Sequence, residues 1–72
     1  MNSKIKISFE NGELIIECNR EGLKYLSDIC ANLSKLSDQK AKTPSNHYHL
    51  MPEMKNVLEG SLPTVIILNQ KL

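Results

Sequence analysis

Polar and apolar residues alternate near the start of the chain. In the segment Lys4–Phe9, and again in Leu14–Cys18, every second side chain is apolar. A period of two is typical of a strand with one buried face. Asn11 and Gly12 lie between these segments and favour a tight turn, because both residues tolerate positive φ. The pattern predicts a β-hairpin. Its core-facing side chains are expected to be Ile5, Ile7, Phe9, Leu14, Ile16 and Cys18.

The apolar spacing then changes to three and four residues, which predicts an amphipathic helix from Arg20 to Leu36. Asn19 is a favourable N-cap residue immediately before it. Gly22 supports two interpretations, a close approach of the helix to the sheet or a tolerated weak point of the helix. The side chains on the apolar stripe and its flanks are Leu23, Leu26, Ile29, Cys30, Leu33 and Leu36.

A polar stretch, Ser37–Ser45, is expected to form an exposed loop before the third strand, Asn46–Met51. Alternation in this strand directs Tyr48 and Leu50 inward, with the two histidines outward. Tyr48 is nonetheless retained as a candidate contact residue, because aromatic side chains suit protein interfaces.

The remaining segments predict a turn and a last strand. Pro52–Glu59 is expected to form a short helical turn that begins at Pro52 and is followed by Gly60. The last strand is Thr64–Leu68, where four consecutive apolar residues predict a central strand covered on both faces.

Residues 1–72 therefore predict one small α+β domain with the order β-β-α-β-β. The expected architecture has two layers, a four-stranded, mostly antiparallel sheet covered on one face by one helix. One helix leaves the other sheet face open, so this face is a candidate contact surface for a partner or a second copy. Besides one pair from the last strand, its expected residues are Lys4, Lys6, Ile15, His47 and His49.

Charge and composition exclude several classes of function. Nine basic against eight acidic residues give a net charge of +1, too balanced for bulk attraction to nucleic acid. No apolar stretch reaches the ~18 residues of a membrane-spanning helix, and no secretory signal is recognisable. The protein is therefore expected to stay in the cytoplasm, with Cys18 and Cys30 as thiols. Both cysteines are interpreted as small core residues rather than nucleophiles.

His47 and His49 are the sharpest chemical feature of the sequence. Two residues apart on a strand, they project from the same face, about 7 Å apart along the chain. They could share a metal, although the sequence identifies no third and fourth ligand. No nucleophile elbow, phosphate-binding loop or acid/base couple is recognisable. We therefore expect no enzymatic activity and no cofactor.

Three stretches together resemble a known family. They are Asn19–Leu26 at the helix start, Asn46–Leu50 followed by Pro52-Glu53, and Glu59–Ile66 before the last strand. This order is similar to immunity protein 32 of bacterial polymorphic toxin systems, a family of small α+β domains. The resemblance implies that the protein binds a cognate toxin and blocks it. The positions that match the family are Glu21, Gly22, Leu23, His47, His49, Leu50 and Gly60.

The sequence thus predicts a non-enzymatic toxin inhibitor that contacts its toxin through the open sheet face and the turn after the third strand. The residues expected at this surface are His47, Tyr48, His49, Met51 and Glu53. Two other interpretations remain open. The histidine pair could serve a small metal- or ligand-binding module, or the open face could form a homodimer.

Overall fold

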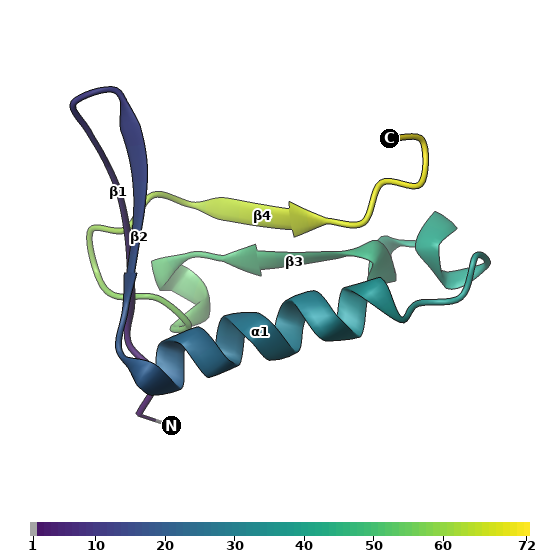
Figure 1. Cartoon of the computed structure of the whole chain (residues 1–72), viewed down its shortest axis with the longest axis horizontal. Helices are drawn as coiled ribbons and strands as arrows, with labels where there is room; N and C mark the ends of the chain where they lie inside the picture. Colours follow the sequence, from purple (N-terminus) through teal and green to yellow (C-terminus); the bar gives the residue numbers. More distant parts are fainter. Residues whose placement is uncertain (1) are drawn as a thin grey trace.

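A computed structural model describes residues 2–72, and its main elements follow the predicted order of two strands, a helix and two strands (Figure 1). The strands are β1 (Ile5–Glu10), β2 (Glu13–Cys18), β3 (His47–Leu50) and β4 (Thr64–Ile67), and the helix is α1 (Arg20–Ser34). Short 3₁₀ turns are η1 (Lys40–Lys42), η2 (Pro44–Asn46) and η3 (Pro52–Met54). No helix among these residues is long and apolar enough to cross a membrane.

The N-terminal hairpin forms as predicted. β1 and β2 pair antiparallel, and the turn residues Asn11 and Gly12 have φ values of 52° and 81°. Ile7 faces Ile16 across the strands, so the apolar residues share one face. The register also places Lys6 opposite Glu17 on the other face of the hairpin, where their opposite charges attract.

The predicted single four-stranded sheet is wrong, because the strands form two separate antiparallel pairs, β1–β2 and β3–β4. The outer edge of β1 is occupied by the segment Leu58–Leu62. The amide of Leu58 donates to the Ile5 carbonyl at 2.8 Å, and that of Leu62 to the Ile7 carbonyl at 2.9 Å. Ser61 Oγ accepts from the Ile7 amide at 3.1 Å. This connecting segment thus takes the bonds that a third strand would need.

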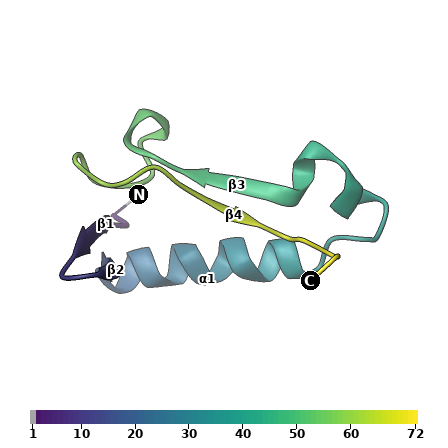
Figure 2. The same cartoon turned by 90° about the horizontal axis from the view of Figure 1, so that it is seen from above.

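The helix and the second strand pair run side by side, and the hairpin stands across one end of them (Figures 1 and 2). The side of β3–β4 that faces α1 carries Tyr48, Leu50 and Ile66, which all belong to or pack on the core. One helix on one face, as predicted, therefore holds for β3–β4 and not for the hairpin. The predicted open sheet face combines the histidines with Lys4, Lys6 and Ile15. This combination is wrong, because these three residues belong to the N-terminal hairpin segment, which forms a separate sheet.

The core lies where the hairpin base, α1 and β3 meet. Its central side chains are Ile5, Ile7, Ile29 and Leu50. Each such side chain contributes about 1.5–3 kcal/mol when fully buried. Since the domain is small, these few residues carry a large share of its stability.

The start of α1 is fixed against the first strand. The Asn19 side chain caps the helix by accepting from the Gly22 amide at 2.8 Å, and it also accepts from the Lys4 amide at 2.9 Å. A Cβ added at Gly22 would lie 2.4 Å from the carbonyl oxygen of Lys4. The first interpretation of this glycine, a close approach between helix and strand, is therefore confirmed.

The predicted buried stripe of α1 is confirmed at Leu26, Ile29 and Leu33, which belong to or pack on the core. It is wrong at two other positions, and the helix ends at Ser34 rather than Leu36. Gly22 and Ile29 are its buried residues, whereas Leu23 is 59% exposed and Cys30 is also exposed. The close contact at Gly22 sets the rotation of the helix, and the residue seven positions later lies on the same face. The prediction that Cys30 is a core residue is wrong.

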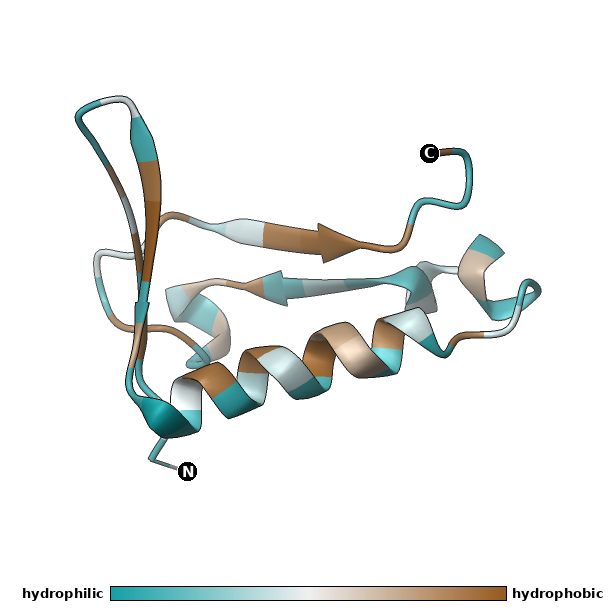
Figure 3. Ribbon diagram, in the orientation of Figure 1, coloured by the Kyte–Doolittle hydropathy of each residue, from teal (hydrophilic) through white to brown (hydrophobic). Residues whose placement is uncertain are grey.

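Several apolar strand residues expected in the core are exposed. Phe9 is 62% exposed, and Leu14 and Ile16 are also exposed, because the hairpin extends past β4 (Figures 1 and 3). β4 is not covered on both faces, since Val65 is 38% and Ile67 is 54% exposed. In β1, the core-facing residues Ile5 and Ile7 are fully buried.

The connecting segments are more ordered than predicted. Ser37–Ser45 contains η1 and the start of η2, and its Ala41 is buried. The turn predicted over Pro52–Glu59 is shorter, because η3 stops at Met54 and is followed by Lys55 with φ 57°. Pro52 occupies the first turn of η3, as predicted.

Candidate partner-binding surface

The side of β3–β4 turned away from α1 carries four side chains from the two strands. His47 lies opposite Ile67, and His49 lies opposite Val65. Because side chains alternate along a strand, these four residues share one face, and Tyr48 and Leu50 share the other. We call this group, His47, His49, Val65 and Ile67, the outer face.

The two histidines lie together as the sequence predicts. Their ring centroids are 4.9 Å apart and the ring planes are nearly perpendicular, at 89°. His49 is exposed, and His47 is half-buried with Nδ1 3.2 Å from the Asn46 side-chain oxygen. Within residues 2–72, no three or more His, Cys, Asp or Glu side chains gather into a metal-binding group. The pair by itself therefore supplies two ligands, fewer than a typical zinc site uses.

Tyr48 projects toward the helix, away from the histidines. Its hydroxyl is hydrogen-bonded to the Tyr25 hydroxyl, and the two rings meet edge to face with centroids 6.2 Å apart. Burial raises the pKa of Tyr25 to about 12, and the hydrogen bond with Tyr48 adds to this effect. The structure thus places Tyr48 in the packing between α1 and β3, and not on the outer face.

Met51 and Glu53 extend the surface past the end of β3. Met51 is half-buried and keeps an extended backbone, with φ −156° and ψ 150°. Its side chain therefore continues the alternation of His47 and His49. Glu53 is exposed in η3, where it adds a negative charge beside the strand end.

Asn56, which the sequence analysis does not single out, anchors this end of β3. Its side-chain oxygen accepts from the Met51 amide at 2.9 Å, and its side-chain nitrogen donates to the His49 carbonyl at 2.7 Å. An asparagine after a turn is too common a signal to predict such a contact from sequence.

Replacing Asn56 with alanine is expected to destabilise the domain by about 1–3 kcal/mol, because the backbone groups of His49 and Met51 lose their partners. Urea denaturation of Asn56→Ala measures this change. Asn32→Ala, at an exposed position of α1, is the matched control and is expected to stay within about 0.5 kcal/mol of the wild type. Equal losses in the two variants would rule out the anchoring role.

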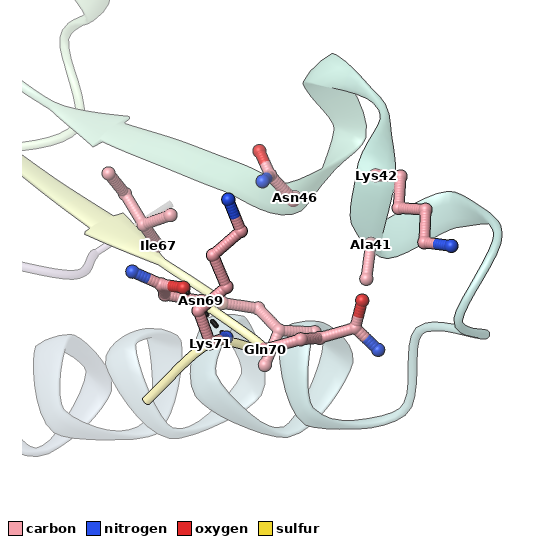
Figure 4. Close-up of a pocket in the computed structure, with 8 residues that line it drawn as sticks. Ala41, Lys42, Asn46, Ile67, Asn69, Gln70 and Lys71 are labelled. Atoms are coloured by element: carbon pink, nitrogen blue, oxygen red, sulfur yellow. Dashed lines mark hydrogen bonds between the residues drawn. The ribbon is translucent and has the colours of Figure 1, made fainter.

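A hollow of about 510 Å³ borders the outer face at the C-terminal end of β4 (Figure 4). Lys42 and Lys71 line it together with side-chain amides, and Ile67 connects it to the outer face. Its lining carries no acid that could act as a general acid or base. The hollow therefore gives the outer face a positively charged border. The residues that line it are Ala41, Lys42, Asn46, Ile67, Leu68, Asn69, Gln70 and Lys71.

The two cysteines lie on other elements than the histidines, Cys18 on β2 and Cys30 on α1. Cys18 is half-buried on the hairpin, and burial raises the pKa of its thiol. A raised pKa reduces the thiolate fraction that a nucleophile needs. Cys30 is exposed on α1.

Comparison with known proteins gives one match. The model of a family described as immunity protein 32 matches residues 13–71, which run from β2 almost to the end of the chain. No curated protein and no solved structure matches the chain.

Proposed function

The chain belongs to the immunity protein 32 family, and we propose on this basis that it binds and neutralises a cognate bacterial toxin. Neutralisation by binding requires no bond to be made or broken by the inhibitor. The composition of the outer face, in which imidazole and branched apolar side chains lie together, suits such a contact role. The family match over 59 of 72 residues, from 13 to 71, is the observation that carries the proposal.

We assign the toxin contact to the outer face together with Met51 and Glu53. Val65, Ile67 and Met51 supply apolar contact area, and the histidines supply flat, polar rings. Glu53 on one side and the lysine-lined hollow on the other form a charged border. An apolar centre with a polar rim is the usual arrangement of a protein–protein interface.

The supporting structure favours tight binding because it holds this surface in place. β3 is bonded to β4 along one edge, and its end is held by Asn56 on the other. Tyr48 and Leu50 fix the opposite side of the same strand to the core. A backbone that is already held in its binding geometry loses less conformational entropy on binding, which improves affinity.

Two other roles would use the same side chains. A metal- or ligand-binding module would use the two histidines, and the 4.9 Å separation of their rings is the observation in its favour. A homodimer through the outer face would bury Val65 and Ile67, together with both histidines. Each alternative requires the outer face to be occupied by something other than the toxin, so toxin binding distinguishes the proposed function from both.

The direct experiment first sequences the genes adjacent to this one, where a secreted toxin with a variable C-terminal domain is expected, and uses that domain as the partner. Co-expression with the wild-type protein is expected to restore growth of a strain that expresses the toxin, and the two proteins are expected to co-purify. Elemental analysis of an untagged sample accompanies the experiment. Growth inhibition that persists despite ample protein would refute the proposal, and stoichiometric zinc or nickel without toxin binding would favour the metal-binding module.

A further inference from the structure

One edge of β4 has backbone groups without partners in the structure. The Leu68 amide donates to the Asn46 carbonyl at 2.9 Å, which fixes the phase of the antiparallel bonds between the strands. By alternation, the backbone groups of Ile66 point toward β3, and those of Val65 and Ile67 point to the free edge. Within residues 2–72, no other segment bonds to this free edge.

The other strand edges are covered or carry charges. Leu58–Leu62 covers β1, and Asn56 bonds to the free edge of β3. β2 carries Glu13 and Glu17, and charged side chains on an edge discourage pairing with another strand. β4 has neither form of protection, because Thr64–Leu68 contains no charged residue.

An apolar wall stands beside this free edge. The hairpin extends outward past β4 (Figures 1 and 3). On this outer part, the apolar side chains of the face that also carries Ile7 are exposed. The wall consists of Phe9, Leu14 and Ile16. Together, the wall and the edge form a corner that displays unpaired amides and carbonyls next to apolar side chains, with Lys71 beside Ile67 at its C-terminal end.

We propose that a second copy of the chain fills this corner, with its β4 pairing antiparallel to the β4 of the first copy. Extended backbone is the chemical group that satisfies alternating amides and carbonyls. β4 carries no charged residue that would discourage pairing, and a second strand supplies partners for the amides and carbonyls of its free edge. An identical strand fits the corner because self-pairing brings no like charges together.

The backbone pattern selects one register for this pair. With Ile66 on the two-fold axis, Val65 of each copy lies opposite Ile67 of the other, and all four residues direct their amides and carbonyls across the interface. Centring on Val65 would place Ile67 opposite Pro63, which has no amide hydrogen. Centring on Ile67 would pair Val65 with Asn69, beyond the end of the strand.

The dimer has a consequence for the outer face. Strands in the order β3–β4–β4–β3 make one sheet of four strands, and the outer faces of the two copies become continuous. Each hairpin wall then lies beside the C-terminal half of the other copy's β4, which covers Phe9, Leu14 and Ile16. This inference does not depend on toxin binding and is tested without a toxin.

Sedimentation equilibrium of the untagged protein tests the association, from about 1 µM to about 1 mM, the range of ordinary transient dimers. The average mass is expected to rise from 8.1 kDa toward twice that value. Val65→Lys places a charge at the edge and is expected to stay at the monomer mass. Leu23→Lys, the same change at an exposed site of α1, is expected to behave as wild type. A wild type that stays monomeric, or equal behaviour of the two variants, overturns the proposal.

Cross-linking tests the register in a Cys18→Ala, Cys30→Ser background. Across the axis, Ile66 faces its own copy at a position whose Cα atoms lie about 4.5 Å apart, within disulfide range. Ile66→Cys is expected to form a covalent dimer under mild oxidation. Val65→Cys is the control and is expected to stay reduced, because its two copies are offset by two residues. A dimer that cross-links at Val65 and not at Ile66 overturns the register.

Discussion

Replacing Gly22 with alanine is expected to destabilise the domain by about 2 kcal/mol or more, although alanine is the better helix former by about 1 kcal/mol. The added Cβ would lie 2.4 Å from the Lys4 carbonyl oxygen, 3.0 Å from Ile5 Cγ1 and 3.1 Å from the Asn19 cap oxygen. The Lys4 oxygen belongs to the backbone and cannot rotate away. The helix start must therefore move off the strand, which strains the contact around which the core is built.

The control for Gly22→Ala is Ser27→Ala, at an exposed position of the same helix. That variant removes no tertiary contact recorded in the structure and gains helix propensity, so it is expected to be neutral or slightly stabilising. Thermal and urea denaturation of both variants measure the difference. If Gly22→Ala were as stable as Ser27→Ala, the close packing of α1 on the hairpin would be refuted.

Truncating Leu50 is expected to have the largest effect on stability, a loss of about 2–5 kcal/mol in Leu50→Ala. Leu50 is 1% exposed and lies between the hairpin, α1 and β4. Small domains have total stabilities near the low end of about 5–15 kcal/mol, so this variant is expected to be largely unfolded at moderate temperature.

Leu23→Ala removes the same atoms from a leucine that is 59% exposed, and is expected to cost less than about 0.5 kcal/mol. Both leucines lie within residues 13–71, which match the family, so the match alone does not separate them. Circular dichroism during urea titration resolves the two variants. A comparable loss in both would mean that Leu23 is buried in solution, contrary to the structure.

The parts of the fold that could be predicted are those with local causes. Alternation and the Asn11-Gly12 pair specify the hairpin, because turn geometry fixes the register of its strands. The Asn19 cap specifies where α1 begins. Alternation also specifies that His47 and His49 share a face, since that property follows from strand geometry alone.

The parts that could not be predicted depend on contacts distant in sequence. The strands form two sheets because Leu58–Leu62 is hydrogen-bonded to the edge of β1. The sequence of this segment has no alternating pattern that would predict this pairing. The rotation of α1 is set by the contact of Gly22 with Lys4, which decides that Ile29 is buried and Cys30 exposed.

The candidate surface was predictable only in part for the same reason. Its histidines, Met51 and Glu53 come from one continuous stretch of sequence. The neighbours Val65 and Ile67 join them only through the register of β3 with β4, and Asn56 through a side-chain contact with the strand end. The sequence supports both a core position and a contact role for Tyr48, and its bond to the Tyr25 hydroxyl places it on the core side.

The most direct test of the account is a calorimetric titration of the cognate toxin domain, identified by the co-expression experiment, with the double variant His47→Ala/His49→Ala. We expect toxin affinity to fall about 10–100-fold, or about 1.4–2.8 kcal/mol, with an unchanged circular dichroism spectrum. The control, Lys24→Ala/Asp28→Ala on the exposed side of α1, is expected to bind as wild type. Unchanged affinity of the histidine variant, or an equal loss in both variants, would contradict the assignment of the outer face as the toxin-binding surface.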